Sequence, residues 1–174
     1  MAAISAILLA IFAIPMVRAT PGTAYSFDLK GPNVTMAAAT VSGTHIKEGD
    51  WFRIEGSGTF DTLTSVVSGG GVFTHFNFDG TIHNKAIWMV AGFVSFDSYG
   101  GPHPRKQGGL LKIIVDVYPY LHPEPKATIM FIISCLVNAP GGAPAEGVTV
   151  WTSNGVVPLF DIVVRGHTGF RLSE

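Results

Sequence analysis

The chain has 174 residues, of which 47% are hydrophobic and only 13% are charged, and its formal net charge is −1. This length suits one domain, and so much apolar surface excludes a disordered chain. The charged residues are scattered rather than clustered. That pattern excludes a nucleic-acid partner and a polybasic contact with an anionic membrane surface.

The first nineteen residues form a separate segment. Residues 4–17 are an almost unbroken apolar run, followed by Arg18 and Ala19. The run has the length of the apolar part of a signal peptide and is shorter than the roughly 20 residues that span a bilayer. We therefore predict a signal peptide over 1–19, a mature domain over 20–174, and a secreted protein with no stable membrane span after processing. The run lacks a preceding Lys or Arg, so a short anchor or a buried helix is the alternative.

Two residues bear on covalent chemistry. Asn33 begins the triplet Asn33-Val34-Thr35, a glycosylation sequon in an exported protein, and is the predicted glycosylation site. Cys135 is the single cysteine, so the chain contains no internal disulfide. Its apolar neighbours raise a thiol pKa and keep the thiol inert, which favours a core residue over a nucleophile.

Short runs with the composition of β-strands recur along the rest of the chain. They are rich in Val, Ile, Phe, Thr, Trp and Tyr, and Gly and Pro lie mainly between them, as turns require. No window carries a helical stripe of apolar residues. The runs cover residues 25–29, 33–38, 51–61, 72–78, 86–96, 110–118, 128–137, 148–152 and 157–165.

Two of these runs indicate which of their faces are buried. In 51–61, apolar or Gly residues alternate with polar ones, which predicts a strand with one solvent-facing side. Gly56 and Gly58 on its inner side predict sharp coiling or a close approach of another backbone. The run 128–137 is apolar on both faces. It is predicted to be covered on both sides or to flank an apolar cavity.

Strands separated by tight turns, with no crossover helix, predict an all-β domain with an antiparallel sheet. Few runs carry the charged edges that open sheets need, which favours a closed barrel over the alternative, a β-sandwich. The mature length suits about eight strands, a barrel size that can hold one small ligand.

The Asp79-Gly80 pair predicts a β-hairpin with a two-residue type I′ turn. In that register His75 pairs with Asn84, and the alternation of side chains puts His75 and His83 on opposite faces of the sheet. The two imidazoles then cannot share an ion. We expect no metal site and no cofactor among the chain's six histidines and their neighbours.

The candidate polar site residues are Asp61, His75, Asp97 and Tyr99. Asp97 and Tyr99 lie in a polar stretch after the run 86–96, where a general base and a phenol could serve a barrel mouth. The structural alternative for Asp97 and Asp61 is an Asx turn. The candidate ligand-binding aromatics are Phe73, Trp88, Phe93, Phe96 and Tyr118, although such residues are more often simply part of the core.

Several stretches carry a resemblance to known sequences: YSFDLKGPNVT (25–35), GSGTFD (56–61), VFTHFNFDG (72–80), FVSFDSYGGP (93–102) and CLVNAPGGAPAEGVTV (135–150). The chain resembles a group of small exported proteins of filamentous fungi and actinobacteria to which no activity is assigned. At the level of architecture it is similar to calycin and allene-oxide-cyclase-like or dirigent barrels. The allene-oxide-cyclase-like and dirigent barrels steer the cyclisation or coupling of apolar intermediates without a cofactor, and the likeness transfers no catalytic residue.

Two functions follow from these observations. The first is a secreted β-barrel that binds a small apolar molecule, as a carrier or as a cofactor-free cyclase or isomerase. The second is a non-enzymatic secreted protein that acts through its surface, as an effector, adhesin or cell-wall component. A homo-oligomer is compatible with either function.

Overall fold

The computed structural model describes residues 24–29, 35–40, 46–120, 124 and 127–173. The predicted signal peptide (1–19) and the predicted glycosylation site Asn33 lie outside the described residues. Within them the chain forms eleven strands and no helix, so there is no helix here of the length and hydropathy that a membrane crossing needs. The strands are β1 (Ala24–Asp28), β2 (Thr35–Ala38), β3 (Trp51–Asp61), β4 (Val67–Phe76), β5 (Ile82–His103), β6 (Lys106–Pro119), β7 (Ala127–Cys135), β8 (Gly147–Thr152), β9 (Pro158–Phe160), β10 (Ile162–Arg165) and β11 (Gly169–Leu172).

All strand pairs are antiparallel and join one sheet, which confirms the predicted all-β, antiparallel fold. Two long strands fork. One edge of β3 pairs with β4, and its other edge pairs first with β2 and then with β1. In the same way, β6 pairs with β5 on one edge and with β11 and then β7 on the other. Because of these forks the sheet is not a clean barrel.

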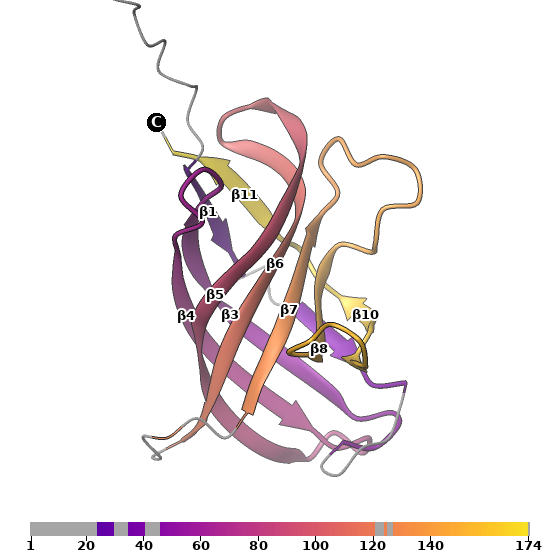
Figure 1. Ribbon diagram of the computed structural model, residues 1–174. Coiled ribbons are helices and arrows are strands. Elements are labelled where there is room, and N and C mark those ends of the chain that lie inside the picture. Colours follow the sequence, from indigo (N-terminus) through magenta and orange to yellow (C-terminus); the bar gives the residue numbers. More distant parts are fainter. Residues whose placement is uncertain (1–23, 30–34, 41–45, 121–123, 125–126, 174) are drawn as a thin grey trace, which may run out of the picture.

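The sheet nevertheless folds over on itself. Pairings run from β3 through β4, β5, β6, β11 and β1 back to β3. In Figure 1, β5, β6 and β7 lie side by side in front, and the purple strands β2 and β3 pass behind them. The strand β5 is far longer than the predicted run 86–96, and four register shifts against β6 interrupt its ladder. Bulges bend and twist a strand, which lets one long strand follow a curved surface.

The interior is apolar and, at one end, filled with aromatic rings. Phe60 near the end of β3 is 2% exposed and stacks on Tyr25 of β1, with 5.1 Å between ring centroids. Phe96 of β5 meets Phe60 edge-on at 4.7 Å, and Phe170 of β11 packs edge-on against both. Offset and edge-on pairs are the favourable aromatic geometries. This end of the interior is therefore a packed core.

The glycines of β3 and β4 mark a close approach of two backbones, as predicted for Gly56 and Gly58. Gly56 pairs with Gly71 of β4, and a Cβ added at either residue would overlap backbone atoms of the other strand. The space over Gly56 is occupied by the Trp88 ring, whose Nε1–H donates to the Glu55 carbonyl oxygen at 3.1 Å. The glycine run 69–71 lies inside β4 and not between strands, so β4 begins five residues before the predicted run 72–78.

The strand β7 is covered on both of its faces, as its sequence predicted. Phe131 and Ile133 are fully buried on the inner face, and Met130 on the other face is only 8% exposed. Ile129 of the same strand lines the cavity described below. Cys135 at the end of β7 is 2% exposed, and burial raises the pKa of its thiol, which confirms that Cys135 is a core residue.

Candidate functional site

At the end of the interior opposite the aromatic rings around Phe60, the sheet lines a cavity of about 400 Å³. Its volume lies within the roughly 300–1,000 Å³ of small-molecule sites. Among its lining residues, Ala86 and Phe160 are almost fully buried, whereas His83 and Ala127 are exposed and lie at the mouth. The lining comprises Ile46, Phe73, His75, His83, Asn84, Ala86, Val117, Pro119, Ala127, Ile129, Val150, Leu159 and Phe160. Apart from two histidines and one asparagine, the walls are therefore apolar.

The hairpin between β4 and β5 brings both histidines to this cavity, which the sequence-based register did not predict. The Asn77 carbonyl accepts from Gly80 N–H, and Asn77 N–H donates to the Thr81 carbonyl, so the loop is Phe78–Gly80 with Gly80 at φ 82°. A type I′ turn needs positive φ at both central residues. Ser65 and Asn138 are the only non-glycine residues with positive φ in the described part of the chain, so the predicted turn type is wrong.

A one-residue bulge on β5 follows this loop. Phe76 pairs with Ile82 and His75 pairs with Asn84, which leaves His83 as an extra residue on β5. The bulge turns His83 toward the same side as His75, and the two ring centroids are 4.7 Å apart. The prediction that these histidines face opposite sides of the sheet is therefore wrong. The extra residue shifts the register by one, which offsets the three-residue loop, so the pairing of His75 with Asn84 is the predicted one although His83 points to the other face.

His75 is held at the cavity wall by a buried carboxylate. Its Nε2 lies 3.1 Å from Asp50 Oδ2, and the two residues are 6% and 3% exposed. Asp50 also accepts from the backbone N–H groups of Lys47 at 2.9 Å and Phe78 at 3.1 Å. The ring of His75 meets the edge of Phe160, with centroids 5.4 Å apart. Asp50 thus joins the start of β3, the β4–β5 hairpin and the His75 ring.

The electrostatics of this pair define the state of His75. Burial raises the pKa of Asp50, but hydrogen bonds from Lys47, His75 and Phe78 lower it and prevail, so Asp50 is ionised. Burial lowers the pKa of His75 from its ordinary value of 6.5, and the nearby His83 lowers it further, against the raising effect of Asp50. His75 is therefore a neutral imidazole at pH 7. An ionised carboxylate only accepts, so Nε2 carries the proton and Nδ1 holds the free lone pair.

This lowered pKa predicts a pH-dependent stability. Unfolded His75 takes up a proton near pH 6.5, and the folded residue does so only at lower pH. The stability linked to His75 is therefore complete above pH 6.5 and is lost as the pH falls below it, by at most about 1.4 kcal/mol per pH unit for one proton. Chemical denaturation between pH 7.5 and 5 should show a steeper loss for the wild type than for His75→Gln. Equal slopes in the two proteins would contradict this prediction.

The predicted aromatics divide between the cavity and the packed core. Phe73 lines the cavity. Trp88 is fully buried against Phe131 and lies outside the lining, and Phe93 and Phe96 belong to the aromatic rings around Phe60. Tyr118 is half-buried and pairs with Ile87, and it too lies outside the lining.

Of the predicted polar residues, His75 alone lies at the cavity. Asp61 accepts from the backbone N–H groups of Leu63 at 2.8 Å and Thr64 at 2.9 Å, which is the Asx-turn arrangement. Asp97 and Tyr99 lie within β5 rather than after a strand end, and Asp97 is exposed. Burial, followed by the charge of Asp97, raises the pKa of Tyr99. The structure brings Asp97 and Tyr99 near each other but not to the cavity.

Three residues of the site had no clear signal in the sequence: His83 and Asn84, which line the cavity, and Asp50, which anchors His75. His83 was assigned to the wrong face because a bulge leaves no sequence mark comparable to a turn pair. Asn84 was recognised only as the partner of His75. Asp50 precedes an alternating strand in a Glu-Gly-Asp turn, where most carboxylates are solvated. Only its three hydrogen bonds identify it as buried and structural.

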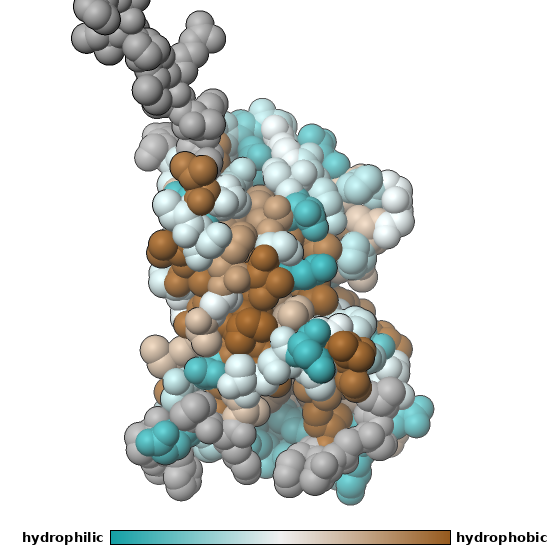
Figure 2. All heavy atoms as spheres, viewed as in Figure 1, coloured by the Kyte–Doolittle hydropathy of each residue, from teal (hydrophilic) through white to brown (hydrophobic). Residues whose placement is uncertain are grey.

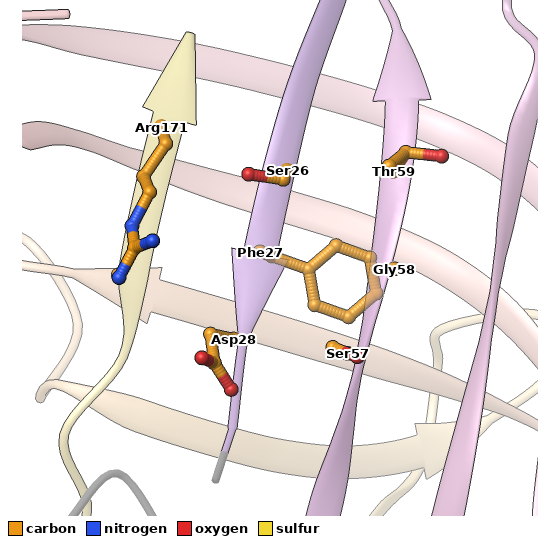
Figure 3. A pocket seen from close by; sticks show the side chains of 8 residues that line it. Ser26, Phe27, Asp28, Ser57, Gly58, Thr59 and Arg171 are labelled. Atoms are coloured by element: carbon orange, nitrogen blue, oxygen red, sulfur yellow. The ribbon is translucent and has the colours of Figure 1, made fainter. Parts of the chain in front are cut away.

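A second, shallower depression of about 280 Å³ lies on the outer surface of β1, β3 and β11 (Figure 3). Ser26 and Arg171 face each other across β1 and β11, and Thr59 flanks Ser26 on β3. The polar part of its lining consists of ordinary outward-facing strand residues, and Gly169, which has open space where a Cβ would be, adds to its hollow shape. Unlike the cavity, it contains no histidine.

Within the described part of the chain, no three His, Cys, Asp or Glu side chains come together as a metal ion would require. Comparison with known protein families, curated proteins and solved structures gives no match to this chain. The fold and site define an all-β protein with an apolar cavity and a carboxylate-anchored histidine at its wall.

Proposed function

We propose that this chain is a secreted protein that binds one small, largely apolar molecule in the cavity between β4 and β9. The observation that carries the proposal is an apolar cavity of about 400 Å³ with a buried histidine at its wall. Apolar walls supply affinity, and a few placed polar groups orient the ligand. His75, His83 and Asn84 are these groups, in place of Asp61, Asp97 and Tyr99, which lie outside the lining.

The fold that suits this function is a distorted barrel. The ring of pairings through β3, β4, β5, β6, β11 and β1 supports it, as does the near-continuity of β9 and β10, which only Asp161 separates. The forks at β3 and β6 support the alternative, a β-sandwich. In either case the cavity lies between the inner faces of the sheet.

The exported form in this proposal is residues 20–174, released from a signal peptide at 1–19 and glycosylated at Asn33 where the host glycosylates. The resemblance to small exported proteins of filamentous fungi and actinobacteria agrees with it. The architectural likeness to calycin and allene-oxide-cyclase-like barrels suggests a carrier or a cofactor-free cyclase or isomerase.

Blocking the mouth of the cavity should weaken ligand binding. Ala127 lines the cavity and is exposed, so Ala127→Trp adds bulk at the mouth without repacking the core. We expect it to weaken binding of the neutral fluorescent probe N-phenyl-1-naphthylamine at least about tenfold, equivalent to about 1.4 kcal/mol. The matched control is Ala91→Trp, at an exposed residue of β5 that does not line the cavity. Wild-type binding by both variants, or no binding by the wild type, would contradict the proposal.

One observation favours the second function, a protein that acts through its surface. Val72 and Ile87 pair across β4 and β5, and with Met89 and Val94 they are 43–53% exposed on one face. Figure 2 shows apolar side chains gathered over the middle of the molecule on the side where β5, β6 and β7 lie. Contiguous exposed apolar surface marks protein contacts, including self-association into a homo-oligomer. Native mass spectrometry separates the two functions, because a ligand-binding protein from its own host retains a small molecule and a surface protein does not.

A further inference from the structure

We propose that His75 is a general base that removes a proton from carbon in the molecule bound in the cavity, with Asp50 as the positioning residue. This inference rests on the proposed function and extends it from binding to proton-transfer catalysis. The base would act through Nδ1, because the Nε2–H is engaged by Asp50 at 3.1 Å. Among the described residues, no hydrogen bond to Nδ1 is present.

The arrangement has the parts that such a base needs. The neutral form is available at pH 7 because burial lowers the pKa of His75. An ionised Asp50 fixes the tautomer and stabilises the imidazolium that forms when the proton arrives. Apolar walls lower the local dielectric constant and so strengthen electrostatic interactions near the base. The titratable groups that act on His75 are Asp50, from the segment before β3, and His83, from β5.

A hydrogen-bond donor lies across from the base. Asn84 is the direct cross-strand partner of His75, and both side chains line the cavity. Directly opposed Cβ atoms are about 4.5–5.5 Å apart, so one small molecule can touch both side chains. The Asn84 amide, with His83 beside it, can donate to an oxygen that gains negative charge.

The position of Asn84 opposite His75 defines the class of substrate and the proton-transfer step. The substrate is a small, mostly apolar carbonyl compound with a C–H bond next to the carbonyl. The proton passes to His75 Nδ1, the electron pair of the C–H bond forms the C=C bond of an enolate, and the carbonyl oxygen takes the charge opposite Asn84. When the substrate also has a C=C bond in the β,γ position, the enolate is conjugated with it. Return of the same proton to the γ carbon then moves that double bond to the α,β position and gives an isomer, so no atom or electron is gained or lost and no co-reactant is needed.

A general probe of a base in an apolar pocket tests this inference. In 5-nitrobenzisoxazole, removal of the ring C–H proton forms a nitrile while the N–O bond breaks, and the freed oxygen becomes the phenolate of the same, coloured molecule, which absorbance records. We expect the wild-type protein to accelerate this reaction and His75→Gln to lose at least about 100-fold of the acceleration. Gln at 75 can still donate to Asp50 but is not a base. Binding of N-phenyl-1-naphthylamine, measured in parallel for both proteins, corrects the two rates for any difference in the occupancy of the cavity.

Further measurements distinguish the roles of His75, Asp50 and His83. The wild-type rate should rise with pH to a plateau, with its midpoint below 6.5. Asp50→Asn should move that midpoint still lower, because Asp50 raises the pKa of His75; an unmoved midpoint would mean that Asp50 is merely structural. Loss of the rate in His83→Gln but not in His75→Gln would assign the base to His83 and overturn the inference.

The wild-type protein provides a test that needs no variant. Nitrogen NMR of the imidazole should show a protonated Nε2 and an unprotonated Nδ1 in His75 at pH 7, and the opposite tautomer would overturn the inference. Probe binding without a His75-dependent rate would defeat the inference alone. Absence of probe binding would defeat the proposed function itself.

Discussion

Gly71→Ala is expected to destabilise the protein by at least about 3 kcal/mol or to prevent it from folding. Gly71 lies opposite Gly56, where β3 and β4 approach most closely. A Cβ at Gly71 would overlap the Glu55 carbonyl oxygen, which is backbone and cannot rotate away. The strands would have to separate, and that movement would disturb the Trp88 ring, which packs over Gly56 and donates to the same carbonyl.

Gly169→Ala is the matched control, because Gly169 also lies in a strand but has open space where its Cβ would be. Alanine restricts the unfolded chain more than glycine does, so this variant should equal or slightly exceed the stability of the wild type. Urea denaturation of both variants provides the measurement. Equal unfolding free energies for Gly71→Ala and Gly169→Ala would show that β3 and β4 are not in close contact.

Asp50→Ala is expected to cost about 3 kcal/mol of unfolding free energy. Its carboxylate accepts from Lys47 N–H, Phe78 N–H and the His75 ring, and removing it leaves these donors without their partner. A buried donor that loses its acceptor costs about 1–3 kcal/mol, and partial access of water to the Lys47 and Phe78 groups reduces the sum.

Asp79→Ala controls for the loss of a carboxylate in the same hairpin. Asp79 accepts from the backbone N–H and the hydroxyl of Thr81, but it is exposed. We therefore expect a cost below about 1 kcal/mol, as for other exposed turn residues. Thermal melts of the two alanine variants measure the difference. A cost at Asp79 equal to that at Asp50 would contradict the structural role assigned to Asp50.

Local sequence patterns predicted which segments form strands better than they predicted where those strands begin and end. The alternation in Trp51–Asp61 defined β3 to the residue, because one buried and one solvated face impose a period of two. The strand β5 was predicted at half of its length, since its Gly- and Pro-containing end resembles a loop. Only pairing with β6 through several bulges shows that it continues to His103. The strand β11 was not predicted, because its four residues depend on β1 for their pairing.

The candidate site was predictable only in part, for a similar reason. His75 and Phe73 lie two residues apart on β4, so their side chains point to the same face of the strand. Both therefore line the cavity. His83 reaches the cavity through a bulge, and Asp50, which does not line the cavity, lies beside His75 through contacts with one distant segment, β4 and the loop after it. Asp97 and Tyr99 were chosen because polar residues gathered there, and such local clustering says nothing about which cavity a side chain faces.

The pairing of β1 with β11 sets the order in which this chain can be completed during synthesis. Tyr25 lies opposite Leu172, and Ser173 N–H donates to the Ala24 carbonyl at 2.7 Å. The strand β1 therefore has both of its edges paired only after β11 has been synthesised. Such distant pairing slows folding, because the whole stretch between Tyr25 and Leu172 must be present before the two strands can meet. A nascent chain still lacking those final residues would leave one edge of β1 open to other chains.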